Sequence, residues 1–181
     1  MSMRRLPDGY SISGVAADEI PALIAVDLAS GQLFAGTGLL PEWAEGDFVP
    51  ADVLEAAVPG GHLFAARSPK GNPVGFALTS VRDGSLYLDQ ISVDPAHGRR
   101  GLGGALVRRV VKDAGRRKLK TVTLSTFRDV AWNGPFYRSL GFREVPRRKM
   151  TGWMLDLEGA QAERGLDVDQ RCFMARRSGW L

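Results

Sequence analysis

Apolar and polar positions recur along the chain with two different periods, and these periods predict its elements. Between residues 101 and 117 the apolar positions fall every fourth residue, at Leu102, Leu106, Val110 and Ala114. This spacing is typical of an amphipathic helix with one face on a core. Residues 10–15 alternate and residues 120–126 are rich in β-branched side chains, as expected for half-buried strands. The chain therefore contains both helices and strands.

The same patterns, together with Gly, Pro and Asp-Gly turn signals, divide the whole chain. The expected strands are 10–15, 62–67, 73–81, 85–93, 120–126, 142–149 and 171–176. The expected helices are 18–30, 50–58, 101–117, 133–141 and 151–164. In helix 18–30 the expected apolar stripe consists of Ile20, Leu23, Ile24 and Leu28. Meander strands come first and crossovers later, which predicts a mixed sheet covered by helices on both faces.

Length and composition agree with one soluble globular domain. The 181 residues suit a single domain, 1–181, with its core at about 10–177, and 44% are apolar and 24% charged. No apolar run approaches 18 residues, and residues 1–14 lack the apolar segment of a secretory signal, so neither a membrane span nor a leader is expected. The single cysteine, Cys172, excludes an internal disulfide and a thiolate metal cluster, and we expect it in the core. A cytoplasmic protein with no metal site is predicted.

Charge is distributed unevenly along the chain. Residues 1–96 carry 5 Lys and Arg against 12 Asp and Glu, whereas residues 97–181 carry 19 against 8. The densest basic run is 97–120. Solvated helix faces explain such a run as well as an anionic ligand does. Nucleic-acid binding is not expected, because the run is interleaved with aliphatic residues and no RNA- or DNA-binding signature is present.

Residues 91–106 join a strand to a helix through a short basic loop that contains several glycines. Backbone N–H groups in such a loop have no partners, and the helix dipole adds partial positive charge behind them. The stretch therefore predicts a phosphate site. Taken alone, two nearby glycines are a weak signal, because any tight turn can need them.

Two motifs resemble those of a known family. Gly98-Arg-Arg-Gly-Leu-Gly103 is similar to the acetyl-CoA signature of the GNAT N-acetyltransferases, and Pro135-Phe-Tyr-Arg-Ser-Leu-Gly-Phe142 is similar to the family's helix that carries a tyrosine and ends in Gly-Phe. The element order from about residue 10 to 177 agrees as well. The resemblance implies an α/β (α+β) fold: a mostly antiparallel sheet of about seven strands, splayed at strands 4 and 5. It also implies acetyl-CoA as the acyl donor.

The resemblance further implies which residues contact acetyl-CoA. They are Ile91, Ser92, Val93, Gly98, Arg99, Arg100, Gly101, Leu102, Gly103, Gly104, Asn133 and Tyr137. The sequence departs from the family pattern at two of its positions. Gly98 replaces the usual Gln or Arg, and Val130 stands where many members have Asn, which leaves Asn133 as the candidate.

Acetyl transfer to an amine needs a base for the amine proton and an acid for the departing thiolate. Tyr137 aligns with the family's tyrosine and is the predicted acid, with Ser125 as a weaker alternative. Asp89 is the predicted base, on the expectation that Asp89 and Gln90, being adjacent on a strand, point to opposite faces. Glu42, Glu45 and Asp47 in loop 31–49 are alternatives, either as base or for binding a cationic substrate.

The predicted function is acetyl transfer from acetyl-CoA to a primary amine in a ternary complex. The acidic first part of the chain favours a cationic acceptor. The sequence does not distinguish a small amine from a peptide as the acceptor, nor a monomer from a homodimer. The alternative is a non-catalytic module or sensor that binds coenzyme A.

Overall fold

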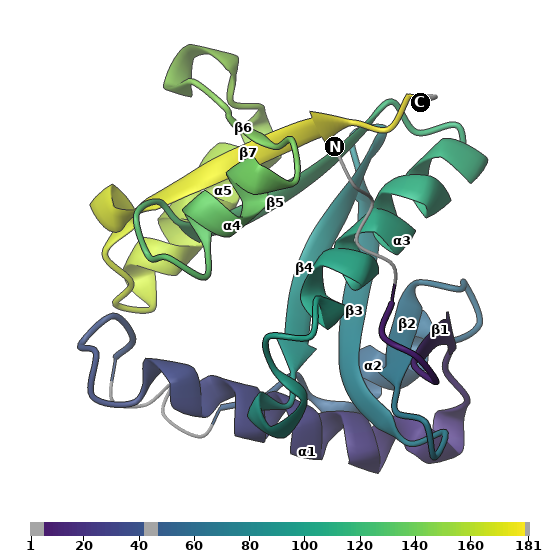
Figure 1. Ribbon diagram of the computed structural model, residues 1–181. Helices are drawn as coiled ribbons and strands as arrows, with labels where there is room; N and C mark the ends of the chain where they lie inside the picture. Colours follow the sequence, from purple (N-terminus) through teal and green to yellow (C-terminus); the bar gives the residue numbers. More distant parts are fainter. Residues whose placement is uncertain (1–5, 42–46, 180–181) are drawn as a thin grey trace.

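The computed structural model describes residues 6–41 and 47–179, which form a seven-stranded sheet in the order β1-β2-β3-β4-β5-β7-β6 (Figure 1). The strands are β1 (Ser11–Gly14), β2 (Leu63–Arg67), β3 (Pro73–Arg82), β4 (Ser85–Val93), β5 (Thr121–Phe127), β6 (Arg143–Glu144) and β7 (Arg171–Arg177). The α-helices are α1 (Ile20–Gly31), α2 (Ala51–Ala57), α3 (Leu102–Arg116), α4 (Gly134–Ser139) and α5 (Gly152–Glu163). Short 3-10 turns are η1 (Ala17–Glu19), η2 (Gln32–Phe34), η4 (Pro95–His97), η5 (Arg147–Lys149) and η6 (Val168–Gln170).

Helices cover both faces of the sheet, as predicted. On one face the apolar stripe of α3 packs with α4 against the sheet in a core that includes Leu106, Val110 and Phe142. On the other face α1 and α2 bury Leu23 and Leu54 against β2 and β3. The helix α5 lies on this second face too, but over Tyr87 and Phe173 of β4 and β7. Cys172 is buried in the α3 core, as expected.

The sheet opens between β4 and β5. These two strands run parallel and pair only from Ser85–Tyr87 to Thr121–Thr123, whereas β5 pairs with β7 along its whole length. Beyond Tyr87 the two strands diverge, which Figure 1 shows as the separation of β4 from β5 toward α1. The predicted splay at strands 4 and 5 is confirmed.

Two predicted features of the elements are wrong. The expected strand 142–149 is reduced to the two residues of β6, because Pro146 cannot donate to a ladder and the chain turns into η5. In α1 the expected apolar stripe included Leu28, which is 37% exposed, while Asp27 is only 5% exposed. Near its C-terminal end the helix therefore presents the Asp27 carboxylate, and not Leu28, to the sheet.

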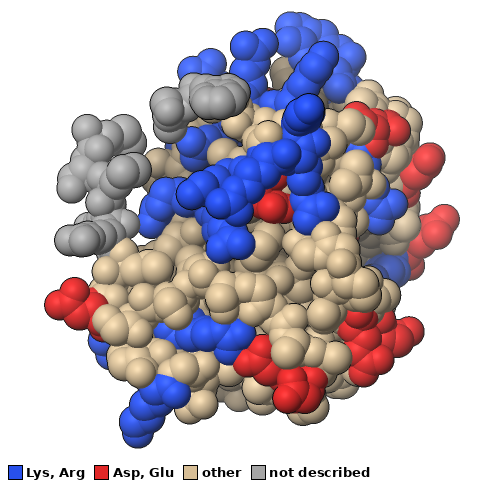
Figure 2. All heavy atoms as spheres, turned by 90° about the vertical axis from the view of Figure 1, so that its right-hand side faces the viewer, with Lys and Arg blue, Asp and Glu red and all other residues tan. Residues whose placement is uncertain are grey.

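The uneven charge along the chain becomes a separation of charge on the surface. On the face at the right of Figure 1, Lys and Arg gather over the upper part, and Asp and Glu lie mainly toward the lower and right margins (Figure 2). The exposed basic residues of the run 97–120 include Arg99, Arg100, Lys112 and Arg116. Lys112 and Arg116 lie on the solvent-exposed side of α3, and the opposite side of the helix packs on the core.

Candidate active site

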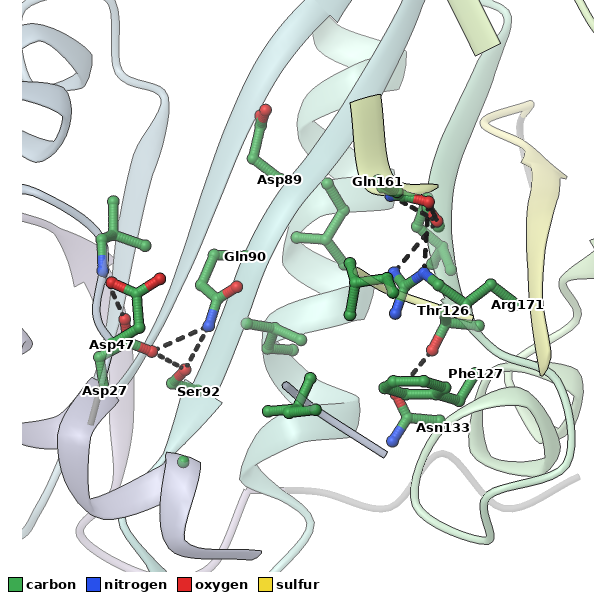
Figure 3. A pocket seen from close by; sticks show the side chains of 18 of the residues that line it. Asp27, Asp47, Asp89, Gln90, Ser92, Thr126, Phe127, Asn133, Gln161 and Arg171 are labelled. Carbon is green, nitrogen blue, oxygen red and sulfur yellow. Dashed lines mark hydrogen bonds between the residues drawn. The ribbon is translucent and has the colours of Figure 1, made fainter. Parts of the chain in front are cut away.

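A cavity of about 690 Å³ lies where β4 and β5 separate. Its walls come from Leu88–Ser92 of β4 and Leu124–Phe127 of β5, and from α1, α4, α5 and the start of β7. Figure 3 shows the polar side chains converging on it from opposite walls. Segments far apart in the sequence thus meet at the opening of the sheet.

A β-bulge sets the direction of the side chains on β4. Leu78 pairs with Gln90 while the next residue, Thr79, pairs with Leu88, so Asp89 is the extra residue of β4. As a result Asp89 and Gln90 both line the cavity. The prediction that only one of them can face it is wrong, because simple alternation fails at a bulge. The two side chains diverge, with Gln90 extending toward Asp27 and Asp89 pointing away from it (Figure 3).

Asp27 of α1 holds one end of the cavity together. Its Oδ1 accepts hydrogen bonds from Ser92 Oγ at 2.5 Å and Gln90 Nε2 at 2.8 Å, and its Oδ2 accepts one from the Val49 N–H at 2.9 Å. The sequence analysis missed this residue. The sequence did contain a signal for it, because Asp27 is an acid among the apolar residues of the predicted helix 18–30.

The edge of β4 that faces the gap carries free amides. Asp94 N–H donates to Val74 O at the end of the β3–β4 ladder. Because N–H groups alternate along an antiparallel strand, those of Ile91 and Val93 point away from β3 toward the gap. The N–H of Ser92 points to β3, and its hydroxyl donates to Asp27. Two of these three predicted contact residues therefore present backbone donors to the gap.

Residues 98–104 connect β4 to α3 as a loop with open donors. The Gly98 N–H donates to Pro95 O, whereas the first helical bond of α3 runs from the Ala105 N–H to Gly101 O. The N–H groups of Leu102, Gly103 and Gly104 thus have no backbone acceptor among the described residues. Gly101 caps the helix with φ of +81°, a left-handed conformation that favours glycine.

Basic side chains flank these open donors. Arg99 and Arg100 are exposed beside the first turn of α3, and Arg99 has φ of +58°, which is uncommon for a residue with a side chain. His97 precedes the loop, but its Nδ1 lies 2.9 Å from the Tyr10 hydroxyl. The loop combines positive charge with unpaired N–H groups, which suits a pyrophosphate.

Tyr137 and Asn133 enter the cavity from α4 and the turn before it. Tyr137 is only 7% exposed, and burial raises the pKa of its hydroxyl above the ordinary value. Asn133 stands at the N-cap of α4, yet its Oδ1 accepts from Thr126 Oγ1 at 2.7 Å instead of capping the helix. The turn between them requires Gly134, since a Cβ there would lie 2.0 Å from Arg128 O.

Asp89 is a half-buried acid, and one of its two carboxylate oxygens has no hydrogen-bond partner among the described residues. Its Oδ2 is buried and makes no hydrogen bond within the described part of the chain. Burial raises the pKa of this carboxyl, and the nearby Ser80 hydroxyl and then the charge of Arg82 oppose that rise. Tyr87, next to it in the cavity, has its pKa raised to about 12 by burial and by the charge of Asp89.

The opposite wall is formed by Ser125, Gln161 and Arg171. Gln161 Nε2 donates to Ser125 Oγ at 3.1 Å, Arg171 Nη2 donates to the same oxygen at 3.2 Å, and Arg171 Nε donates to Gln161 Oε1 at 3.3 Å. The guanidinium lies 4.7 Å from the centre of the Phe127 ring. Ser125, the alternative acid, is thus engaged by two neighbours.

Loop 31–49 contributes part of the cavity wall. Phe34 packs against Phe127 and Trp132, with ring centroids 5.8 and 5.9 Å apart, and so joins η2 to the far side of the gap. Asp47 lines the cavity and lies 3.8 Å from Arg164. Glu42 and Glu45 lie outside the described residues.

The described residues contain no group of three His, Cys, Asp or Glu side chains that could hold a metal ion. In the same residues, no helix has both the length and the apolar character needed to cross a membrane.

Comparison with known proteins agrees with the fold and the motifs. In sequence, 79 residues are 34% identical to the [ribosomal protein bS18]-alanine N-acetyltransferase of Escherichia coli (strain K12), which is 44% of this chain and 53% of that protein. The match spans about half the length of that relative. In structure, PaiA N-acetyltransferase from Thermoplasma acidophilum, solved in complex with coenzyme A, superposes with a TM-score of 0.72 at 13% identity. That superposition covers 93% of this chain and 98% of the other.

The structure of the Escherichia coli ribosomal-protein-S18-alanine N-acetyltransferase superposes with a TM-score of 0.64 at 21% identity, over 95% of this chain and 96% of that one. At such identities the likeness shows the fold alone. The model of the acetyltransferase (GNAT) family matches residues 33–142, which include the sheet opening, the loop 98–104 and Tyr137. This chain therefore belongs to the GNAT acetyltransferase family.

Proposed function

We propose that this protein transfers an acetyl group from acetyl-CoA to a primary amine by direct attack in a ternary complex. The observation that carries the proposal is the gap between β4 and β5, which has the open donors of loop 98–104 at the end of β4 and a polar cavity beside it. Membership of the GNAT family and the relatives that are N-acetyltransferases support it.

In this proposal the acyl donor is held mainly by backbone donors. The pyrophosphate lies on the first turn of α3, where Arg99 and Arg100 add charge. The two arginines take over the contact that Gly98 cannot make, since Gly98 has no side chain and its N–H is already bonded to Pro95 O. The thioester lies in the gap, where the N–H groups of Ile91 and Val93 stabilise the oxyanion of the tetrahedral intermediate.

The reaction balances without a further reagent. The amine nitrogen attacks the thioester carbon, a C–N bond forms, and the C–S bond breaks. One amine proton goes to Asp89, and the departing thiolate takes a proton from Tyr137. A proton then passes from Asp89 through solvent to the Tyr137 oxygen, which restores both groups for the next turnover. The products are an amide and free coenzyme A.

Asp89 is preferred over Asp27 as the base because of their partners. The carboxylate of Asp27 already accepts three hydrogen bonds, whereas Asp89 Oδ2 has none among the described residues. Burial raises the pKa of Asp89, which makes its carboxylate a stronger base. Tyr137 keeps its proton at neutral pH, as an acid must, because the ordinary pKa of tyrosine is about 10 and burial raises the pKa of this hydroxyl further.

The acceptor class is only partly defined by charge. The cavity lining carries Asp27, Asp47 and Asp89 together with Arg82, Arg164 and Arg171. This balance does not select a purely cationic acceptor, although the protonated amine itself is attracted to Asp89. A peptide amine is supported by the name of the relative, a [ribosomal protein bS18]-alanine N-acetyltransferase, and a small-molecule amine is the alternative. A cytoplasmic location and a homodimer stay predictions.

A thiol-release assay with acetyl-CoA and a panel of amines tests the function. We expect acetyl-CoA to bind, and Asp89→Asn and Tyr137→Phe each to lower kcat by about 10²-fold or more with little change in acetyl-CoA affinity. The control is Asp156→Asn, an exposed acid on α5 that should behave as wild type.

The outcomes separate the alternatives. Binding of acetyl-CoA without thiol release from any amine would favour the non-catalytic module. Absence of acetyl-CoA binding would refute both functions. Near-wild-type turnover by both variants would refute the assignment of base and acid.

A further inference from the structure

Arg171 is the first residue of β7 and extends its guanidinium into the cavity, facing the wall that carries Asp89 and Gln90 (Figure 3). Two of its nitrogens donate hydrogen bonds, Nε to Gln161 Oε1 and Nη2 to Ser125 Oγ. The side chain of Gln161 is itself fixed by its bond to Ser125 Oγ. The guanidinium is therefore held in one orientation before any ligand arrives.

Neither of these partners neutralises the positive charge. Arg67, Arg117, Arg128 and Arg147 each form a salt bridge with a carboxylate, whereas Arg171 forms none within the described residues. Its Nη1 makes no hydrogen bond in this part of the chain either. A guanidinium keeps its charge in proteins, and a half-buried charge without a counter-ion is costly. A group of this kind is suited to bind an anion.

The opposite charge stands across the same cavity. Tyr87 lies within electrostatic reach of both Asp89 and Arg171, so the carboxylate and the guanidinium flank one aromatic side chain. In the proposed function the amine of the acceptor lies at Asp89. A second group on the same acceptor then extends toward Arg171.

We propose that Arg171, oriented by Gln161 and Ser125, binds a carboxylate of the acceptor, so that the acceptor is an amine that also carries a carboxylate. This inference rests on the proposed acetyl transfer and names the substrate class of the same site. The guanidinium fork matches both oxygens of a carboxylate.

The composition of the subsite favours a monoanion over a phosphate. It offers one positive charge, one amide and one hydroxyl, and the ring of Phe127 lies under the guanidinium at 4.7 Å. A dianionic phosphate needs more positive charge in direct contact. Two other arginines line the cavity, and each lies near a carboxylate: Arg164 is 3.8 Å from Asp47, and the charge of Arg82 acts on Asp89.

Matched acceptors test the inference. We would measure kcat/KM for thiol release from acetyl-CoA with ω-amino acids from glycine to 6-aminohexanoate, each beside its ω-amino amide. The chain length covers different separations of amine and carboxylate. For the best-fitting length we expect the wild-type protein to prefer the acid over the amide by about 10- to 100-fold, mainly through KM.

Variants locate the preference. In Arg171→Gln the preference should fall to about onefold, and circular dichroism and acetyl-CoA binding check that the variant is folded. Arg171→Lys should keep part of the preference, since it keeps the charge but loses the fork. Arg177→Gln, at the exposed end of the same strand, is the matched control and should keep the full preference.

A peptide arm compares short peptides that begin with Asp or Glu with those that begin with Asn or Gln. A preference for acids that is lost in Arg171→Gln supports the inference, and the arm in which it occurs shows whether the carboxylate belongs to a small molecule or a peptide. Equal use of acids and amides by the wild-type protein, or equal loss of both in Arg171→Gln, would overturn it while leaving acetyl transfer intact. Absence of thiol release from every acceptor would overturn the proposed function and this inference with it.

Discussion

Replacing Asp27 with asparagine tests whether a buried carboxylate holds α1 against β4 at the end of the cavity. The side chain is 5% exposed and accepts three hydrogen bonds, from Ser92, Gln90 and the Val49 N–H. Asparagine has nearly the same shape, so it changes hydrogen-bonding capacity and charge without creating a cavity. The variant therefore isolates the carboxylate from the packing of the helix.

The expected magnitude follows from these contacts. Asparagine has one acceptor oxygen, so at least one of the three donors must face its NH2 group and is left unsatisfied, at about 1–3 kcal/mol. The remaining bonds lose ionic assistance, about 1 kcal/mol each. Relief of carboxylate desolvation offsets part of this cost. We expect Asp27→Asn to lower the free energy of unfolding by about 2 kcal/mol.

Urea unfolding followed by circular dichroism measures this change. The midpoint should fall by about 1 M with an unchanged slope, since the same surface is exposed on unfolding. In an acetyl-transfer assay the KM for the acceptor should rise more than that for acetyl-CoA, because Gln90 and Ser92 lose their common partner. The exposed Asp156→Asn is the control, with an expected change under about 0.5 kcal/mol. A stability of Asp27→Asn equal to or above wild type would refute this reasoning.

Further predictions concern two glycines and one ion pair. Gly134→Ala should lower the free energy of unfolding by about 3 kcal/mol or more, because the new Cβ would lie 2.0 Å from Arg128 O; a thermal melt within a few degrees of wild type would contradict this. Gly101→Ala, at φ of +81°, should lower the free energy of unfolding by about 1–2 kcal/mol and weaken acetyl-CoA binding about tenfold, as measured by calorimetry. An unchanged affinity would show that the conformation of this turn does not matter for acetyl-CoA binding. Glu19 has its pKa lowered to about 2 by the hydrogen bond from Arg67, so its contribution is complete above about pH 4.5 and is lost as pH falls toward 2. Glu19→Gln should therefore be about 1 kcal/mol less stable at pH 7, after discounting for solvent screening, and equal to wild type near pH 2 in urea titrations; a gap independent of pH would show that the ion pair contributes nothing.

The sequence by itself determined the features that depend on neighbouring residues. The four-residue period of α3, the strand β4 and the glycine loop between them are local patterns, and the structure has each where it was predicted. The two family motifs predicted the sheet, its opening between β4 and β5, and the membership that the family comparison confirms. The roles of Asp89 and Tyr137 stay predictions, although both side chains line the cavity. The strand predicted at 142–149 was wrong because an apolar pattern does not say where a ladder ends.

Only the tertiary structure decided which distant residues share the cavity. The bulge of β4 turns Asp89 and Gln90 into the same space, and it exists only through pairing with β3. Asp27 meets Ser92 from 65 positions away, and Arg171 meets Ser125 from 46. A periodic pattern shows which face of an element is buried, but not which partner lies opposite. That depends on strand order and on how far β4 and β5 diverge, and both are properties of the assembled sheet.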